Sequence, residues 1–178
     1  MNILKELPES LNIDGRDYNI NTDFKVWLEV AEKLSEKDVF GVFSLVFNEL
    51  PDNMYSAFTA VMDFYTGGEK SKGKKGKAVF DFVFDAELIY AAFWQQYRIN
   101  LNAVKLHWWE FKALFTGLTA DTRFVTVMGY RQTDLNSIKD KKERKFYRDM
   151  KRLYKLPDRR SEEEKEADFN DALSGLIM

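Results

Sequence analysis

The spacing of apolar residues along the chain predicts a protein built mainly from helices. Over most of the sequence, apolar side chains recur three or four positions apart, which places them on one face of a helix. The clearest such stretch is Ala103–Leu118. Its stripe consists of Val104, His107, Trp108, Phe111, Leu114, Phe115 and Leu118. We therefore expect a helix over this range, with the stripe facing the core.

Other stretches with the same spacing predict further helices. They cover residues 23–34, 39–50, 51–66, 86–98, 121–129 and 135–156. Val39–Leu50 is apolar nearly all round, which predicts a short buried helix. Pro51 suits the first turn of the next helix, and Gly67-Gly68 suits its end. Gly129 is expected to close the helix that begins near residue 121.

Two segments have patterns that suit strands. Leu11–Asn21 places Asp14-Gly15, a favoured two-residue turn, between alternating apolar positions and predicts a small hairpin. Asn21 or Thr22 would then cap the first helix. Phe80–Phe84 alternates like a strand, and it also resembles the lead-in to a helix capped by Asp81 or Asp85. The sequence leaves this choice open, together with the question of whether the segment pairs with the hairpin.

The expected fold is therefore mainly α, a multi-helix bundle to which the N-terminal segment can add a small β-hairpin. Only 9 Gly and 3 Pro occur among 178 residues, which favours long elements over a many-stranded sandwich. We expect one helical domain over residues 1–157, with a mobile basic loop at 67–78. Residues 158–178 form an acidic C-terminal tail, in which Ser161 and Glu164 have the spacing of a helix cap.

Charge is distributed unevenly although the net charge is only −2. Residues 139–160 hold eleven Lys and Arg against four Asp and Glu, whereas residues 161–178 hold six acids against one Lys. The basic helix at 139–155, with Tyr147 and Tyr154 interleaved, is the best nucleic-acid candidate. The acidic pI of about 5.6 and the adjacent acidic tail argue against nucleic acid as a ligand. The basic and acidic segments can pair with each other, or each can face a partner.

Catalytic chemistry finds little support in the sequence. The chain has no Cys, which excludes a thiolate metal site and a cysteine nucleophile. It has one His, so a Ser-His-Asp catalytic triad would have only this residue as its base. Gly67-Gly68 and the glycines after it lack the spacing of a phosphate loop. We expect a non-enzymatic protein without cofactor or metal. No apolar signal core or membrane-length segment occurs, which favours a soluble intracellular protein.

Two aromatic features have both a structural and a functional interpretation. His107 could act as an acid or base with Glu110, but a lone His among Trp and Phe is more often a hydrogen-bonded core residue, and we favour that role. Trp108 and Trp109 cannot both face the core, because neighbours on a helix diverge by about 100°. Trp109 could anchor a partner, although a helix buried on most sides explains it more readily.

Four segments together resemble the bacteriophage gene-product-fifteen family. They read IYAAFWQQY, LHWWEFKALFTGL, FVTVMGYR and IKDKKERKFYRDMKRLYKLP, and LNIDGRDYNINTDF resembles the family's opening. The resemblance spans about Leu11 to Pro157. It implies a role in the tail module of long-tailed phages of Gram-positive bacteria, similar to that of tail assembly chaperones. The resemblance does not assign a function to any individual residue.

The resemblance implies a phage tape-measure protein as partner, kept soluble in the host cytoplasm until tube subunits assemble around it. We expect self-association, no membrane partner, and absence from the mature virion. Such a chaperone needs apolar grooves between helices. We hypothesise that the partner-binding residues are Trp94, Trp109, Tyr147 and Tyr154. The alternatives are a minor tail or connector protein that stays in the virion, and a small nucleic-acid-binding module.

Overall fold

The computed structural model describes residues 6–68 and 78–158. Within these ranges the chain forms one two-stranded sheet and seven helices, which confirms the predicted mainly α fold with an N-terminal hairpin. The elements are β1 (Ser10–Ile13), β2 (Arg16–Asn19), α1 (Phe24–Ser35), α2 (Val39–Val46), α3 (Met54–Thr66), α4 (Ala86–Tyr97), α5 (Trp108–Thr116), α6 (Arg123–Gln132) and α7 (Lys141–Leu153). The predicted loop at 67–78 falls mostly outside the described residues, as does the acidic tail beyond residue 158.

The hairpin forms where the sequence predicts it. Its turn places Asp14 and Gly15 at φ values of 51° and 88°, the left-handed conformation that a two-residue turn requires. The Asp14 carboxylate also accepts hydrogen bonds from Asn53 and Ser56 at the start of α3, at 2.8 and 2.9 Å. Leu11, Ile13 and Tyr18 turn inward to the core. The hairpin is therefore fixed to α3 through its turn and through its apolar face.

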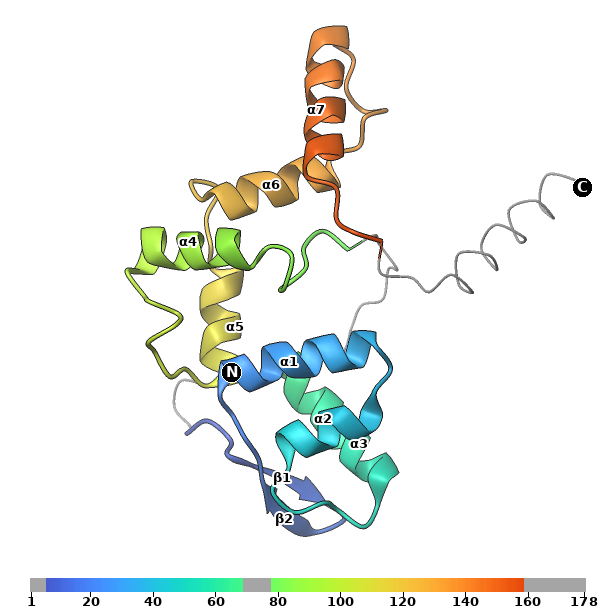
Figure 1. Cartoon of the computed structure of the whole chain (residues 1–178), viewed down its shortest axis with the longest axis vertical. Coiled ribbons are helices and arrows are strands. Elements are labelled where there is room, and N and C mark those ends of the chain that lie inside the picture. Colours follow the sequence, from blue (N-terminus) through green and yellow to red (C-terminus); the bar gives the residue numbers. More distant parts are fainter. Residues whose placement is uncertain (1–5, 69–77, 159–178) are drawn as a thin grey trace, which may run out of the picture.

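The helices form a lower and an upper group joined by α5 (Figure 1). The hairpin and α1, α2 and α3 make the lower group, in which α1 packs on α2 and α3 packs on β1. The upper group contains α4, α6 and α7, with α6 packed between the other two. α5 runs between the groups and contacts α1. α7 stands above α6 and leaves most of its surface free of other helices (Figure 1).

Large aromatic side chains fill the core and join the two groups. Phe111 of α5 is fully buried, and its ring lies within 6.2 Å of five others. These five rings belong to Phe24, Phe82, Phe93, Trp108 and Phe115. They come from α1, from the segment before α4, from α4 and from α5 itself, so one side chain connects most of the core.

The segment Phe80–Phe84, which the sequence left open, is a turn that leads into α4. The Asp81 carboxylate accepts hydrogen bonds from the backbone amides of Val83 and Phe84 at 2.9 and 2.8 Å, which shapes the turn. Residues 80–84 do not pair with the hairpin. Within the described residues, β1 and β2 pair only with each other. Phe80 and Phe82 turn inward against Phe115.

The prediction of a helix over Ala103–Leu118 is wrong in its first turn. Residues 103–107 are not helical, and α5 begins at Trp108. The reason is tertiary: the Leu106 carbonyl accepts from the Phe24 amide, and the Trp108 amide donates to the Thr22 carbonyl, at 3.0 and 2.8 Å. These inter-segment bonds use backbone groups that a longer helix would have kept for itself. Val104 and Leu106 still pack on the core from non-helical backbone.

Other boundaries also need correction. Asp23 caps α1 with its side chain, in place of Asn21 or Thr22, and Asn53 caps α3, so Pro51 lies before that helix. α6 continues through Gly129 to Gln132. The basic helix begins only at Lys141, after the Asp140 cap. α2 ends at Val46 and is not buried all round, because Phe40 is 76% exposed.

Two helical glycines with opposite surroundings give a test of local packing. A Cβ at Gly129 in α6 would meet nothing within 4 Å, whereas a Cβ at Gly41 in α2 would lie 2.3 Å from the Asp38 carboxylate. That carboxylate caps α2 by accepting from the Gly41 amide at 2.8 Å, which lowers the pKa of Asp38. Alanine at Gly41 would displace the cap.

Gly129→Ala is expected to raise the free energy of unfolding by about 0.5–1 kcal/mol, because alanine restricts the unfolded chain and favours the helix. Gly41→Ala is expected to lower it, despite the same gain in helix propensity. Urea denaturation of both variants measures the two changes. Equal shifts for the two variants would contradict the capping geometry at Asp38.

Candidate interaction surface

The Trp108-Trp109 pair joins α5 to the end of α3. The indole N–H groups of Trp108 and Trp109 donate to the carbonyls of Tyr65 and Phe64 at 3.0 and 2.8 Å. The Lys112 ammonium donates to the carbonyls of Tyr65 and Thr66 at 3.1 and 2.6 Å. The last carbonyls of a helix lack partners within it and carry partial negative charge, so indoles and a cation suit them. Trp108, Trp109 and Lys112 of α5 thus cap the C-terminal end of α3.

The Tyr65 ring packs against the rings of Trp27 and Trp108, whose planes lie 24° and 13° from its own. Burial of the phenol raises the pKa of Tyr65. The side chain therefore stays neutral at physiological pH and contributes to packing.

His107 is the N-cap of α5 and does not lie on its apolar stripe. Its Nδ1 accepts a hydrogen bond from the Trp109 amide at 3.0 Å, and its Nε2 lies 3.0 Å from the Pro8 carbonyl. The Glu110 carboxylate accepts from the His107 amide at 2.9 Å, which completes a capping box. The neutral tautomer with hydrogen on Nε2 satisfies both ring nitrogens. These contacts agree with the favoured hydrogen-bonded role, although at a cap position.

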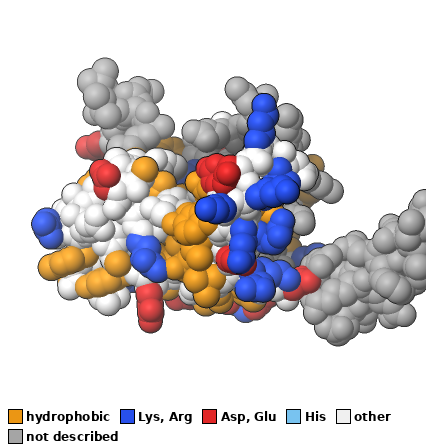
Figure 2. Space-filling view, turned by 90° about the horizontal axis from the view of Figure 1, so that it is seen from above, with side chains coloured by type: hydrophobic (Ala, Val, Ile, Leu, Met, Phe, Trp, Pro, Cys, Tyr) orange, Lys and Arg blue, Asp and Glu red, His pale blue; other side chains and the backbone are white. Residues whose placement is uncertain are grey.

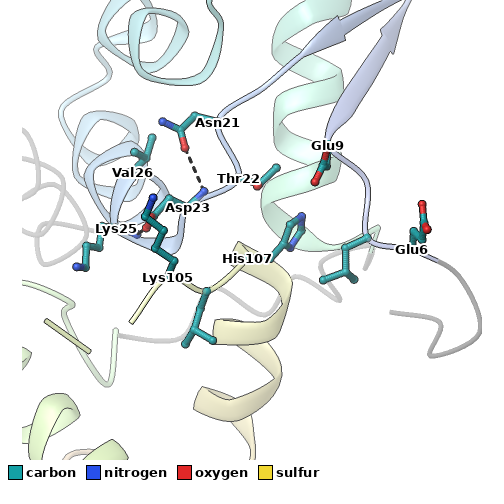
Figure 3. A pocket seen from close by; sticks show the side chains of 11 residues that line it. Glu6, Glu9, Asn21, Thr22, Asp23, Lys25, Val26, Lys105 and His107 are labelled. Atoms are coloured by element: carbon teal, nitrogen blue, oxygen red, sulfur yellow. Dashed lines mark hydrogen bonds between the residues drawn. The ribbon is translucent and has the colours of Figure 1, made fainter. Parts of the chain in front are cut away.

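A broad polar depression of about 1150 Å³ surrounds His107 (Figure 3). It lies between the segment before β1, the start of α1 and the start of α5. Glu6, Glu9 and Asp23 line it together with Lys25 and Lys105, so charges of both signs are present. Asn21 accepts from the Asp23 amide at 3.1 Å, and this contact fixes the entry to α1. The mixed charge favours no single class of ligand.

A buried ion pair fixes the upper group. Arg131 of α6 makes two hydrogen bonds to the Asp85 carboxylate, at 2.6 and 2.8 Å, with side chains only 6% and 1% exposed. The same guanidinium donates to the carbonyls of Val79 and Tyr154, at 3.0 and 2.7 Å. The Asp85 carboxylate also accepts from the Asp81 amide. One arginine thereby connects the segment before α4, α6 and the end of α7.

α7 is attached to α6 by aromatic and basic side chains. The Tyr130 ring lies 5.9–6.1 Å from the rings of Phe146, Tyr147 and Tyr154. The Lys151 ammonium donates to the carbonyls of Arg131 and Thr133 at 2.9 and 2.6 Å, and so caps α6. These contacts occupy one side of α7. No residue of α7 is fully buried.

A narrow apolar crevice of about 200 Å³ opens between α1 and α4. Its walls are Phe24 and Leu28 of α1, Phe82 before α4, Ala86, Ile89 and Tyr90 of α4, and Leu101 and Phe111. At its mouth the Lys25 ammonium donates to the Asn102 carbonyl at 3.0 Å. The crevice is smaller than the roughly 300–1,000 Å³ of ordinary small-molecule sites. It has room for an apolar side chain from a partner.

The structure brings together only two of the four predicted partner-binding residues. Tyr147 and Tyr154 both lie beside Tyr130, half-buried between α6 and α7. Trp94 lies on α4 and is 48% exposed. Trp109 is half-buried against Phe64 of α3, with its N–H already engaged. Their role in binding stays a prediction, and among the four the exposed Trp94 is the most accessible.

Sequence reasoning missed the crevice and the Arg131–Asp85 pair. Asp85 was considered only as a helix cap, yet it makes no side-chain bond to α4. Both features join segments that are distant in sequence, so neither leaves a local pattern. Within the described ranges, no group of three His, Asp or Glu residues is placed to hold a metal ion. Among the helices that the structure describes, none is long and apolar enough to span a bilayer.

Comparison with known proteins gave one match. The model of the family described as "Bacteriophage Gp15 protein" matches residues 3–156, which is most of the chain. The searches of curated proteins and of solved structures found no match. The matched range contains every helix described above.

Proposed function

We propose, from the premise that the chain belongs to the bacteriophage Gp15 protein family, that it is a tail assembly chaperone. It would bind the tape-measure protein in the host cytoplasm, keep it soluble while the tail forms, and leave before the virion is complete. Family membership makes the chain a phage protein. The chaperone role rests on the resemblance to tail-module proteins and on the crevice.

The apolar crevice between α1 and α4 is the observation that carries this proposal. A helical client presents apolar side chains at intervals of three and four residues, and one of them can enter a pocket while the rest cover the rim. Val83, Phe84 and Trp94 are further exposed apolar residues in or beside α4. Binding energy at such surfaces concentrates in one or two buried anchors. The crevice would receive such an anchor.

Filling the crevice tests the proposal. Ala86 is exposed at its rim, so Ala86→Phe is expected to occupy the space and to weaken client binding by about 30-fold or more, the effect of losing one anchor residue. Ala91 is also exposed on α4 but does not line the crevice, so Ala91→Phe is the matched control. The measurement is co-expression with the tape-measure protein, followed by pull-down and light scattering.

The expected result is a soluble complex with the wild-type chain and with Ala91→Phe, and an insoluble client with Ala86→Phe. Circular dichroism checks that both variants keep their helices. A client that stays soluble with Ala86→Phe would exclude the crevice. A client that is insoluble even with the wild-type chain would exclude the chaperone role.

The second candidate is a minor tail or connector protein, which the exposed apolar residues of α2 and α3 favour as a subunit contact. Phe40 and Tyr55 are 76% and 84% exposed there. Recovery of the chain in purified tails would support this role. Self-association is part of both proposals. We also propose that the protein is not an enzyme, since both ring nitrogens of its only His are engaged in structural contacts.

A further inference from the structure

Beside its packed side, α7 carries an apolar stripe that the described residues cover only in part, through the contact of Phe146 with the Tyr130 ring. Phe146, Met150 and Leu153 follow one another at intervals of four and three, which is the spacing of a helix-packing seam. Phe146 and Leu153 are 48% and 67% exposed. Seen from the end of the molecule where α7 stands, an apolar strip runs beside a group of Lys and Arg side chains (Figure 2). α7 is therefore an amphipathic helix with one packed side and one open side.

The open side is strongly basic. Lys142 and Lys145 lie beside the stripe and Lys155 follows α7. All three are exposed, and none makes an ion pair within the described part of the chain. Arg152 lies 3.7 Å from Asp149, which is a loose pair. An apolar stripe flanked by such cations suits an acidic amphipathic helix.

We propose that this face binds the chain's own C-terminal segment, Ser161–Met178. This segment holds six acids against one Lys. Its apolar residues Phe169, Leu173 and Leu176 repeat the same intervals of four and three. Set antiparallel, the two stripes match along their length: Leu153 faces Phe169, Met150 faces Leu173, and Phe146 faces Leu176.

The connection is long enough for this arrangement. In the antiparallel register, residues 161–168 of a helical segment would extend past the end of α7 by about 12 Å. Arg131 and Tyr130 hold Tyr154 in place, and residues 155–160 after it can reach about 20 Å when extended. Antiparallel helix neighbours are commonly joined by connections of this size. The register also places Asp168 and Asp171 beside Lys155 and Arg152, so charge adds to the apolar match.

Docking would cover Phe146 and Leu153 and would neutralise much of the basic face. Because the two segments belong to one chain, their high effective concentration favours docking even when each contact is weak. The proposal is independent of the chaperone function, and its test needs no client.

The absence of Cys makes the test clean, because one introduced thiol gives one labelling site. A nitroxide attached to Ser174→Cys in the full chain is expected to remove the amide NMR signals of residues 146–150 and to leave those of β1 and β2 intact. Phe169→Ala/Leu173→Ala in the labelled chain is expected to restore the lost signals. The matched control, Asn170→Ala/Ala172→Ser, changes residues beside the stripe and should leave them lost.

Three results would overturn the proposal. The α7 signals could keep their intensity in the labelled chain. They could be lost only when isotope-labelled chain is mixed with unlabelled chain carrying the nitroxide, which would assign the face to a second copy. The α7 signals could also keep their intensity beside the nitroxide but change chemical shift on addition of duplex DNA, which would assign the basic face to nucleic acid.

Discussion

Replacing Arg131 with methionine is expected to lower the free energy of unfolding by about 3–5 kcal/mol, the usual effect of breaking a buried ion pair from one side. The substitution leaves the Asp85 carboxylate, 1% exposed, without its cation. It also removes the hydrogen bonds to the carbonyls of Val79 and Tyr154. Three segments of the upper group lose their common contact, so the effect should exceed that of any surface change.

Urea denaturation measures this effect, and Arg123→Met is the matched control. Arg123 lies on the same helix but is exposed, and its guanidinium donates to the Tyr154 hydroxyl. A change within about 0.5 kcal/mol is expected there. The double variant Asp85→Leu/Arg131→Met should recover part of the loss, because it removes both buried charges. A loss of less than about 1 kcal/mol in Arg131→Met would mean that the pair is not buried in solution.

Phe111→Ala is expected to cost about 3–5 kcal/mol, as is typical of a large aromatic residue removed from a core. The side chain is fully buried and packs on rings from α1, α4 and the segment before α4. Its removal leaves a cavity that opens toward the crevice, which Phe111 also lines. The lower and upper groups would then lose their main shared contact.

Phe84→Ala is the control for this second prediction, because Phe84 is 53% exposed. It should change stability by no more than about 0.5 kcal/mol. Denaturation followed by near-ultraviolet circular dichroism reports on the packed aromatic rings. If Phe111→Ala unfolded with a midpoint close to that of Phe84→Ala, the two groups would be held together by other contacts.

The segments that support the family resemblance have structural roles that sequence reasoning assigned only in part. Trp108, Trp109 and Lys112 cap α3, and His107 caps α5. In MGYR, Tyr130 holds α7 and Arg131 holds α4. Sequence reasoning singled out His107, Trp108 and Trp109, but not Lys112, Tyr130 or Arg131. It did not identify their partners, because the acceptors are backbone carbonyls, which every residue type supplies.

The candidate site was less predictable than the fold. Exposure of Trp94 could be anticipated, because it falls off the buried stripe of its helix. The crevice could not, since it depends on how α1 and α4 sit on Phe111 and on the turn at Phe80–Phe84. A pocket between elements depends on their relative placement, about which the spacing within one element carries no information.

The sequence by itself determined the class of fold, the hairpin turn at Asp14-Gly15 and the end of α3 at Gly67, because these depend on local spacing and on φ values that few residues accept. Tertiary structure alone decided where α5 begins, that Phe80–Phe84 is a turn, and that Asp85 meets Arg131. The reason is physical: a backbone group or a buried charge takes the partner that the assembled core places within reach. Where that partner lies far away in the sequence, the contact overrides local preference.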